Sequence, residues 1–303
     1  MIKYYSWAIA QKVLSYVPGG DKVYYGLGSI VQKNVKGRAG PMSSAINLVK
    51  NIQNLVGKDA VIMDVGTGWY HHEPFLLYLC GFSKFYLFDV VEKSKFIYIK
   101  NYLNGIIDNI EVISNELQID ESNAIDKINE LLSCNSKKEI YKICNFEPVI
   151  TKDTNRLFMP ENSIDLMVSN CVLNHIPLDI LKPELKILKK ILKPNGYMHF
   201  LIGHDDHWTF HDLKMNKFQY YIYSDKYYKR LFETNFQFQN RLVKKELIDL
   251  FDQCGLILTN YFEHKNNSSR AEIEKIIHKL DSRFSKYSID DLSIIHSYVT
   301  LQK

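Results

Sequence analysis

The chain of 303 residues is long enough for one large α/β domain with insertions or for two small domains. Its composition, 46% hydrophobic and 24% charged, is that of a globular protein and excludes a largely disordered chain. The net charge of +4 comes from interspersed residues, which excludes the clustered basic face that nucleic-acid-binding proteins use.

Short apolar runs alternate with segments of helical periodicity from Ala60 onward, a pattern that predicts a parallel sheet with helices on both faces. We expect the first five strands at residues 60–64, 85–89, 148–151, 164–169 and 197–202. We expect the helices between them at residues 75–80, 94–107 and 181–192. The predicted fold class is therefore a doubly wound, Rossmann-like α/β sheet.

The C-terminal part completes this sheet to seven strands. It is expected to form a helix at 243–254, a strand at 256–262, a helix at 271–280 and a strand at 294–301. The last two strands are candidates for an antiparallel pair.

Three segments depart from this alternation. Residues 1–58 are expected to be an N-terminal helical cap, with residues 59–303 as the main domain. Residues 114–145 are longer than a crossover requires and predict an insertion with two helices. Residues 204–240, dense in Tyr, Phe, His and Asn, predict a lid over the site, whose rings either line a sugar pocket or pack the lid itself.

The cysteines and the N-terminus indicate the compartment. The five cysteines are widely spaced and odd in number, which argues against a disulfide framework or a zinc site and favours a reducing cytoplasm. The apolar N-terminal stretch is interrupted by Gln11 and Lys12, so we expect no signal peptide. No run approaches the roughly 20 apolar residues that span a bilayer, so we expect any membrane contact to be peripheral.

The central motif is an apolar strand that ends in Asp64 and continues as Gly66-Thr67-Gly68 into a helix. Glycines let the main chain approach a ligand, and the helix N-terminus offers free N–H groups. A dinucleotide-binding turn requires a third glycine at position 71, where this chain has His71. A nicotinamide oxidoreductase is therefore a disfavoured alternative.

A second acid, Asp89, ends the second strand 21 residues after Gly68. A carboxylate at this place can accept hydrogen bonds from both hydroxyls of a ribose. Three further features follow in order: Asp153 after the third strand, Asn170 at the end of the fourth, and the turn Lys193-Pro194-Asn195-Gly196 before the fifth.

In this order the motifs resemble those of the class I S-adenosylmethionine-dependent methyltransferases, over roughly residues 59–301. The resemblance implies S-adenosyl-L-methionine as the cofactor. It also implies site roles: the methionine part beside Gly66, Thr67 and Gly68, with Asp64 orienting that turn, the ribose on Asp89, the adenine amino group on Asp153, and the transferring methyl near Asn170.

A narrower resemblance lies in Asp206-His207-Trp208 and in residues 236–242, which are similar to segments of uncharacterised bacterial methyltransferases. Such enzymes are often associated with surface-polysaccharide or glycolipid pathways. This association implies a small-molecule acceptor, a sugar nucleotide or a glycan, that is methylated on a hydroxyl; the fold does not fix that substrate.

A sugar hydroxyl is a poor nucleophile, so an oxygen acceptor requires a general base. His207 is the first candidate, with Asp205 and Asp206 beside it to orient the imidazole. His204 and His211 are second candidates. Two alternatives stay open for these residues: a metal site built from the histidines, or solvated loop residues. A further alternative for the whole chain is a non-catalytic partner subunit with a methyltransferase fold.

Overall fold

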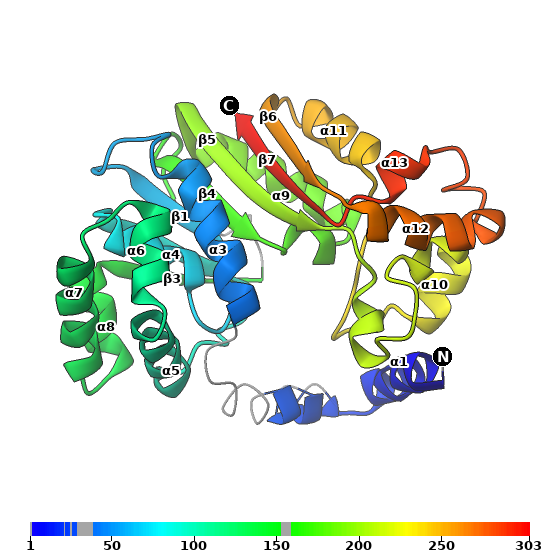
Figure 1. Cartoon of the computed structure of the whole chain (residues 1–303), viewed down its shortest axis with the longest axis horizontal. Coiled ribbons are helices and arrows are strands. Elements are labelled where there is room, and N and C mark those ends of the chain that lie inside the picture. Colours follow the sequence, from blue (N-terminus) through cyan, green and yellow to red (C-terminus); the bar gives the residue numbers. More distant parts are fainter. Residues whose placement is uncertain (1, 21, 25, 29–38, 153–158) are drawn as a thin grey trace. The chain divides into compact units, whose positions relative to one another are not determined.

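The computed structural model describes residues 2–20, 22–24, 26–28, 39–152 and 159–303. Its strands form one seven-stranded sheet in the order β3-β2-β1-β4-β5-β7-β6 (Figure 1). This order confirms the predicted doubly wound, Rossmann-like α/β class. The chain adds strands outward from β1 to β3 and then returns to β4 on the other side of β1, which makes the β1–β4 boundary the topological switch point.

The strands lie close to the predicted runs. They are β1 (Val61–Val65), β2 (Lys84–Asp89), β3 (Phe146–Ile150), β4 (Ile164–Asn170), β5 (Leu192–Gly203), β6 (Ile257–His264) and β7 (His296–Gln302). Strand β1 pairs in parallel with β2 and β4, and β2 pairs in parallel with β3. Residues at the carboxyl ends of these strands therefore share one edge of the sheet.

The position of β1 inside the sheet explains its sequence. Ile62, Met63 and Val65 are buried because a central parallel strand is covered on both faces. The acid in this apolar run, Asp64, is buried with them and is only 2% exposed. A buried carboxyl group is costly unless it has hydrogen-bond or charged partners.

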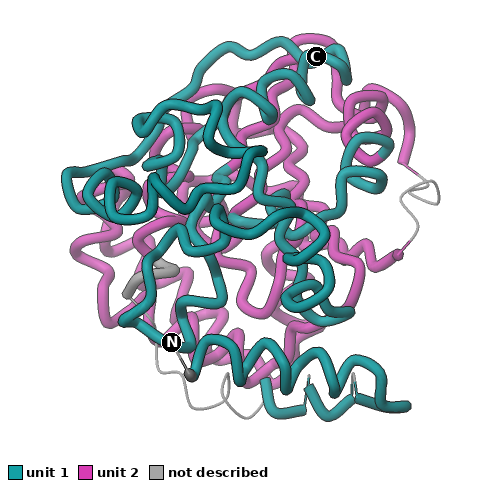
Figure 2. Tube along the Cα trace, turned by 90° about the vertical axis from the view of Figure 1, so that its right-hand side faces the viewer, with its two compact units in different colours: residues 1–28, 171–183, 201–299 teal, residues 29–170, 184–200, 300–303 magenta. Residues whose placement is uncertain are grey.

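Two compact units divide the chain, and Figure 2 colours them separately. Unit 1 comprises residues 1–28, 171–183 and 201–299, and unit 2 comprises residues 29–170, 184–200 and 300–303. The segment expected to be one N-terminal cap is shared between them: helix α1 (Ile2–Tyr16) belongs to unit 1, and helix α3 (Ala39–Ile52) belongs to unit 2.

Unit 2 contains the helices between the first strands. They are α4 (His72–Leu79), α5 (Phe96–Ile107), α6 (Ile110–Leu117), α7 (Glu121–Ser133) and α8 (Lys137–Cys144). Helix α3 packs against α4 and α6, and α7 packs against α5 and α6. The two helices expected in the insertion at 114–145 correspond to α7 and α8, and α6, which runs into its start, is an additional helix. Between β4 and β5 the chain forms η2 (Leu173–His175) and α9 (Leu178–Ile191).

Unit 1 contains the helices that follow β5. They are η3 (His207–His211), η4 (Gln219–Ile222), α10 (Asp225–Leu231), α11 (Lys244–Gln253), α12 (Asn267–Ile276), η5 (Ile277–Lys279) and α13 (Ile289–Leu292). Among the described residues, no helix is long and apolar enough to cross a membrane.

An aromatic core organises the segment 204–240. Trp208, Phe218 and Phe232 are buried in it, together with Tyr4 and Ala8 of α1. The segment was expected to lack helical periodicity, yet it contains η3, η4 and α10. These helices are short and bury rings on several sides, so no regular apolar stripe appears in their sequence.

Candidate functional site

A glycine turn follows β1 in unit 2. Gly66 and Gly68 have φ angles of 81° and 64°, a left-handed conformation that residues with a Cβ atom adopt only under strain. The N–H groups of Gly66 and Thr67 both donate to the carbonyl oxygen of Phe88 on β2, at 2.8 and 3.1 Å. The turn is thereby tied to the end of the neighbouring strand.

Asp89, the last residue of β2, binds this turn. Its Oδ2 accepts the N–H of Gly68 at 3.0 Å, and its Oδ1 accepts the N–H of Val91 at 3.3 Å. The ammonium group of Lys93 lies 3.7 Å from Oδ1. A carboxylate has about four acceptor positions, so Asp89 keeps capacity for a ligand's hydroxyl groups. The structure therefore brings together the glycine turn and the strand-two acid.

Asp64 lies in β1, two residues before the turn. Burial raises the pKa of Asp64 well above its usual value, the charges of Glu73 and Asp89 raise it further, and a hydrogen bond from Thr67 opposes them. Its Oδ2 has no hydrogen-bond partner among the described residues. The carboxyl group is thus buried beside other acids with an acceptor left free.

Asn170, at the end of β4, contacts a residue that sequence reasoning left out of the site. Its amide Nδ2 donates to Oε1 of Glu73 at 2.6 Å and lies 3.3 Å from the hydroxyl of Ser44. Glu73 lies in the first turn of α4, where an acid is favoured by the helix dipole. It is also buried, at 4% exposed, and burial raises the pKa of its carboxyl group. Asp153, the expected adenine contact, lies outside the described residues.

His71, the residue in place of a third glycine, is part of a buried network. Its Nδ1 lies 2.6 Å from the hydroxyl of Thr67, and its Nε2 lies 2.6 Å from the hydroxyl of Tyr141. Burial lowers the pKa of His71 to about 3, so the imidazole is neutral near pH 7. Because both ring nitrogens are engaged in this network, His71 supports the structure of the glycine turn.

A pocket opens over these groups. Its lining includes Gly68, Asp89, Val91, Tyr141 and Ile150. The pocket is small, and the Asp89 carboxylate forms part of its wall.

His207, the first candidate base, lies in unit 1 beside a gap at the end of β5. The position that a Cβ atom on Gly203 would occupy is 3.6 Å from His207 Nε2, and 3.7 Å from both Asp205 Oδ1 and Cys171 Sγ. His207 Nε2 is 3.8 Å from the same Asp205 oxygen. An imidazole, a carboxylate and a thiol thus surround a space that has room for about one methyl group.

The surroundings of His207 keep its ring neutral. Burial lowers the pKa of His207 to about 3, and the charges of His175 and His296 act in the same direction. The rings of His175 and Phe210 lie 4.7 and 5.3 Å from the His207 ring, centroid to centroid. A neutral imidazole can accept a proton, although so low a pKa reduces the driving force for the transfer.

Two of the other candidate residues, Asp206 and His204, are engaged elsewhere. Asp206 is fully buried and accepts hydrogen bonds from the hydroxyl of Tyr4 at 2.6 Å and from the N–H of Trp208 at 3.0 Å. Burial raises its pKa to about 7. His204 is buried, with Nδ1 at 3.2 Å from the carbonyl oxygen of Leu242 and Nε2 at 2.8 Å from the hydroxyl of Ser297. The acid that lies beside His207 is therefore Asp205.

The two segments of the narrower sequence resemblance meet through one side chain. Gln239 donates through Nε2 to the carbonyl oxygen of Asp205 at 2.6 Å, and its Oε1 accepts the N–H of His207 at 3.3 Å. The spacing along the chain gave no signal for this contact. Gln239 therefore holds the backbone at Asp205 and His207 in place.

The metal and sugar-stacking alternatives have specific geometric requirements. Among the described residues, no group of three or more His, Cys, Asp or Glu side chains is arranged to hold a metal ion. The rings of Phe218, Tyr220, Tyr221, Tyr228 and Phe232 are buried in the core of unit 1. These rings therefore serve packing, the second of the two roles considered for them.

Comparisons with known proteins were made by sequence and by structure. No family profile matches the chain, and no curated protein sequence matches it. Among solved structures, an S-adenosylmethionine-dependent methyltransferase from Methanosarcina mazei is 14% identical, with a TM-score of 0.47 over 84% of this chain and 96% of that one.

Two further solved structures are similar in fold. A protein described as a sarcosine dimethylglycine methyltransferase, from Galdieria sulphuraria, is 13% identical, with a TM-score of 0.45 over 85% of this chain and 83% of that one. A geranyl diphosphate C-methyltransferase from Streptomyces coelicolor is 10% identical, with a TM-score of 0.44 over 86% of this chain and 78% of that one. At such identities function must be argued from this chain's own residues.

Proposed function

We propose that the chain is an S-adenosylmethionine-dependent methyltransferase that acts on a hydroxyl group of a sugar or sugar-like small molecule. The observation that carries the cofactor assignment is the Gly66-Thr67-Gly68 turn bonded to Asp89 at the topological switch point of the sheet. Open α/β sheets bind their ligands at this place.

The residues present fit the parts of this cofactor. The free acceptor positions of Asp89 suit the two ribose hydroxyls, and the small pocket that Asp89 lines lies beside them. The buried acids Asp64 and Glu73 suit the cationic methionine end. Asp153 is proposed for the adenine amino group, and Asn170 for the vicinity of the methyl. The bound cofactor supplies an electrophilic methyl group; the protein supplies binding and orientation.

For the acceptor, we place His207 as the group that receives the hydroxyl proton. Asp205 faces its Nε2 at 3.8 Å, and the side-chain-free Gly203 leaves space beside both. Burial lowers the pKa of His207 to about 3 and raises the pKa of Asp205, so we propose that Asp205 ionises when the acceptor binds and then strengthens the imidazole as a base. Asp206 and His204 act through the backbone around His207 and serve as positioning residues.

Methyl transfer is tested with labelled S-adenosylmethionine and a panel of sugar nucleotides and glycans. We expect incorporation into at least one acceptor, and His207→Ala should lower turnover by about 100-fold or more while leaving cofactor affinity unchanged. Normal turnover of His207→Ala would remove His207 as the base. Cofactor binding without transfer to any acceptor would favour the non-catalytic partner subunit.

A larger side chain at Gly203 tests whether the acceptor occupies the space beside His207 and Asp205, and it leaves these two polar residues unchanged. A Cβ atom at Gly203 meets its neighbours at ordinary contact distances, so Gly203→Ala should retain activity and serve as the control. Gly203→Leu should fill the gap and lower turnover by about 10-fold or more, with cofactor affinity unchanged. Equal activity of the two variants would show that the acceptor does not use this space.

We place the protein in the cytoplasm, in a pathway that modifies sugars for surface polysaccharides. The cap role of residues 1–58 and the lid role of residues 204–240 remain predictions.

The nicotinamide alternative is disfavoured because His71, engaged with Thr67 and Tyr141, stands where close packing against a pyrophosphate needs glycine.

A further inference from the structure

Two carboxyl groups are buried in unit 2 without a positively charged partner among the residues that the structure describes. Asp64 is 2% exposed and Glu73 is 4% exposed. Within the described part of the chain, no lysine, arginine or histidine forms an ion pair with either of them. Buried carboxylates normally have such a partner, so this pair requires an explanation.

The neighbours of Glu73 hold the side chain without supplying charge. The amide of Asn170, from β4, donates to Oε1 at 2.6 Å. Tyr102, on α5, is also close: burial raises the pKa of its phenol, and the negative charge of Glu73 raises it further. Asp64, on β1, is the acid whose pKa the Glu73 charge raises. Every described group that faces Glu73 is therefore neutral or acidic.

One acceptor in this cluster is left open. The Oδ2 atom of Asp64 is shielded from solvent and accepts no hydrogen bond from the described residues. A bare positive charge would satisfy the electrostatics but would leave this lone pair without a donor. An ammonium group meets both needs, because it brings one positive charge and three N–H donors.

We infer that Glu73, together with Asp64, is the counter-charge that binds the α-ammonium group of the cofactor's methionine part, with Asn170 holding the Glu73 carboxyl in place. The inference rests on the proposed function, since it names a partner for the same site. A protonated acid must ionise to bind a cation, so one proton leaves the pair for the buffer as the ammonium enters. The O–H bond of the carboxyl breaks, and no other covalent bond changes.

The test compares three ligands on the full-length chain by calorimetry. S-adenosylmethionine and S-adenosylhomocysteine both carry the ammonium, only the first carries the sulfonium, and 5′-methylthioadenosine carries neither. We expect Glu73→Gln to weaken the first two by about 10- to 100-fold and to leave 5′-methylthioadenosine within about 2-fold. Titration in two buffers of different ionisation enthalpy should show proton release in the wild type and its loss in Glu73→Gln.

Glu184 provides the matched control. It is a buried glutamate of unit 2, on α9, whose pKa burial raises to about 7. Glu184→Gln should bind all three ligands as the wild type does, with the same proton release. This control separates loss of the counter-charge from the general effect of neutralising a buried acid.

The remaining outcomes overturn the inference. Weakening of S-adenosylmethionine alone would assign Glu73 to the sulfonium, and equal weakening of all three ligands would give it a purely structural role. Unchanged affinities in Glu73→Gln would contradict any role in binding. A wild-type chain that binds none of the three ligands would instead refute the proposed function itself, so the two failures are distinguishable.

Discussion

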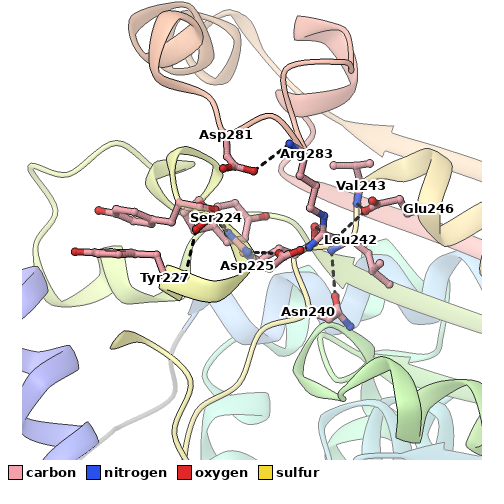
Figure 3. A network of polar contacts seen from close by, with 12 residues as sticks. Ser224, Asp225, Tyr227, Asn240, Leu242, Val243, Glu246, Asp281 and Arg283 are labelled. Carbon is pink, nitrogen blue, oxygen red and sulfur yellow. Dashed lines mark hydrogen bonds and ion pairs between the residues drawn. The ribbon is translucent and has the colours of Figure 1, made fainter. Parts of the chain in front are cut away.

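Two clusters of acids, one in each unit, differ in their partners. In unit 1, Arg283 bridges the exposed Asp225 at 2.7 Å and the partly buried Glu246 at 3.0 Å, as Figure 3 shows. In unit 2, the buried Asp64 and Glu73 lie together with no such cation among the described residues. The charges of the first cluster are thus balanced within the fold, whereas the second cluster is available to a positively charged ligand.

The pKa values of Asp225 and Glu73 shift in opposite directions. Burial by itself raises the pKa of Asp225, but the hydrogen bonds and charges of Arg283 and Arg241 outweigh it and lower the pKa. Among the described residues no cation opposes burial at Glu73, and the pKa of Glu73 is raised. Ionised Asp225 therefore stabilises the ligand-free fold, whereas ionised Glu73 destabilises it.

The largest effect is expected at Arg241, which is 3% exposed in unit 1. It donates to the carbonyl oxygens of Tyr220 at 2.8 Å and Tyr223 at 2.7 Å and also pairs with Asp225. Arg241→Met should lower the free energy of unfolding by about 3–5 kcal/mol, because these acceptors lose their donor. Urea unfolding of the full chain measures this. Arg230 is exposed, so Arg230→Met should change the free energy of unfolding by no more than about 0.5 kcal/mol. A change that small for Arg241→Met would contradict the structural role assigned to Arg241.

A pair of neutralising substitutions should act with opposite signs at pH 7.5 without ligand. Glu73→Gln removes an ionisable group whose charged form is unfavourable, so the melting temperature should rise. Asp225→Asn removes a partner of two arginines, so the melting temperature should fall. Because Asp225 is 65% exposed and solvent screens its ion pairs, this fall should be about 2 °C or less, against a rise of about 2–4 °C for about 1 kcal/mol at the buried Glu73. Differential scanning calorimetry measures both. Shifts of the same sign would show that the two acid clusters do not differ as argued.

The effects of Glu73→Gln and Asp225→Asn on stability should also depend on pH in different ways. A raised pKa means that Glu73 contributes stability below its ordinary value of 4.5 and loses it as the pH rises from there. The advantage of Glu73→Gln over the wild type should therefore grow from pH 4.5 upward. A lowered pKa means that Asp225 contributes stability above its ordinary value of 3.8 and loses it as the pH falls below. Melting curves between pH 3 and 8 would contradict the account if either trend were reversed.

The smallest effect is expected at Lys93, the cation beside Asp89. Its ammonium lies 3.7 Å from the Asp89 carboxylate, and its side chain is 28% exposed. Such partly exposed pairs contribute about 0–1 kcal/mol. Lys93→Met should therefore change cofactor affinity by less than about 5-fold in calorimetry. A larger loss would mean that Asp89 depends on its own cation, as Asp225 and Glu246 of unit 1 do.

The sequence predicted the parts of the site that adjacent strands determine. The apolar run before Asp64 and the Gly66-Thr67-Gly68 turn indicated a central parallel strand, and Asp89 falls at the end of the next strand. Because parallel strands place their carboxyl ends at one edge, the contact between Asp89 and Gly68 follows from these positions. The seven-stranded class followed from the same alternation.

The parts that were missed depend on contacts between distant segments. Glu73 has the sequence signature of an ordinary helix start, and only the arrival of Asn170 from β4 reveals it as a buried partner. Similarly, Asp205 and Asp206 are equivalent in sequence, and the hydroxyl of Tyr4, 202 residues from Asp206, distinguishes them. Periodicity carries no information about such pairings.

The most direct test of the central claim, that the Gly66 to Asp89 region binds the cofactor, is calorimetric titration of the full chain. S-adenosylmethionine and S-adenosylhomocysteine should bind with micromolar affinity, NAD should not bind, and Asp89→Ala should abolish binding of the first two. Binding of NAD in their place, or no binding of either methionine compound to the wild type, would contradict the claim.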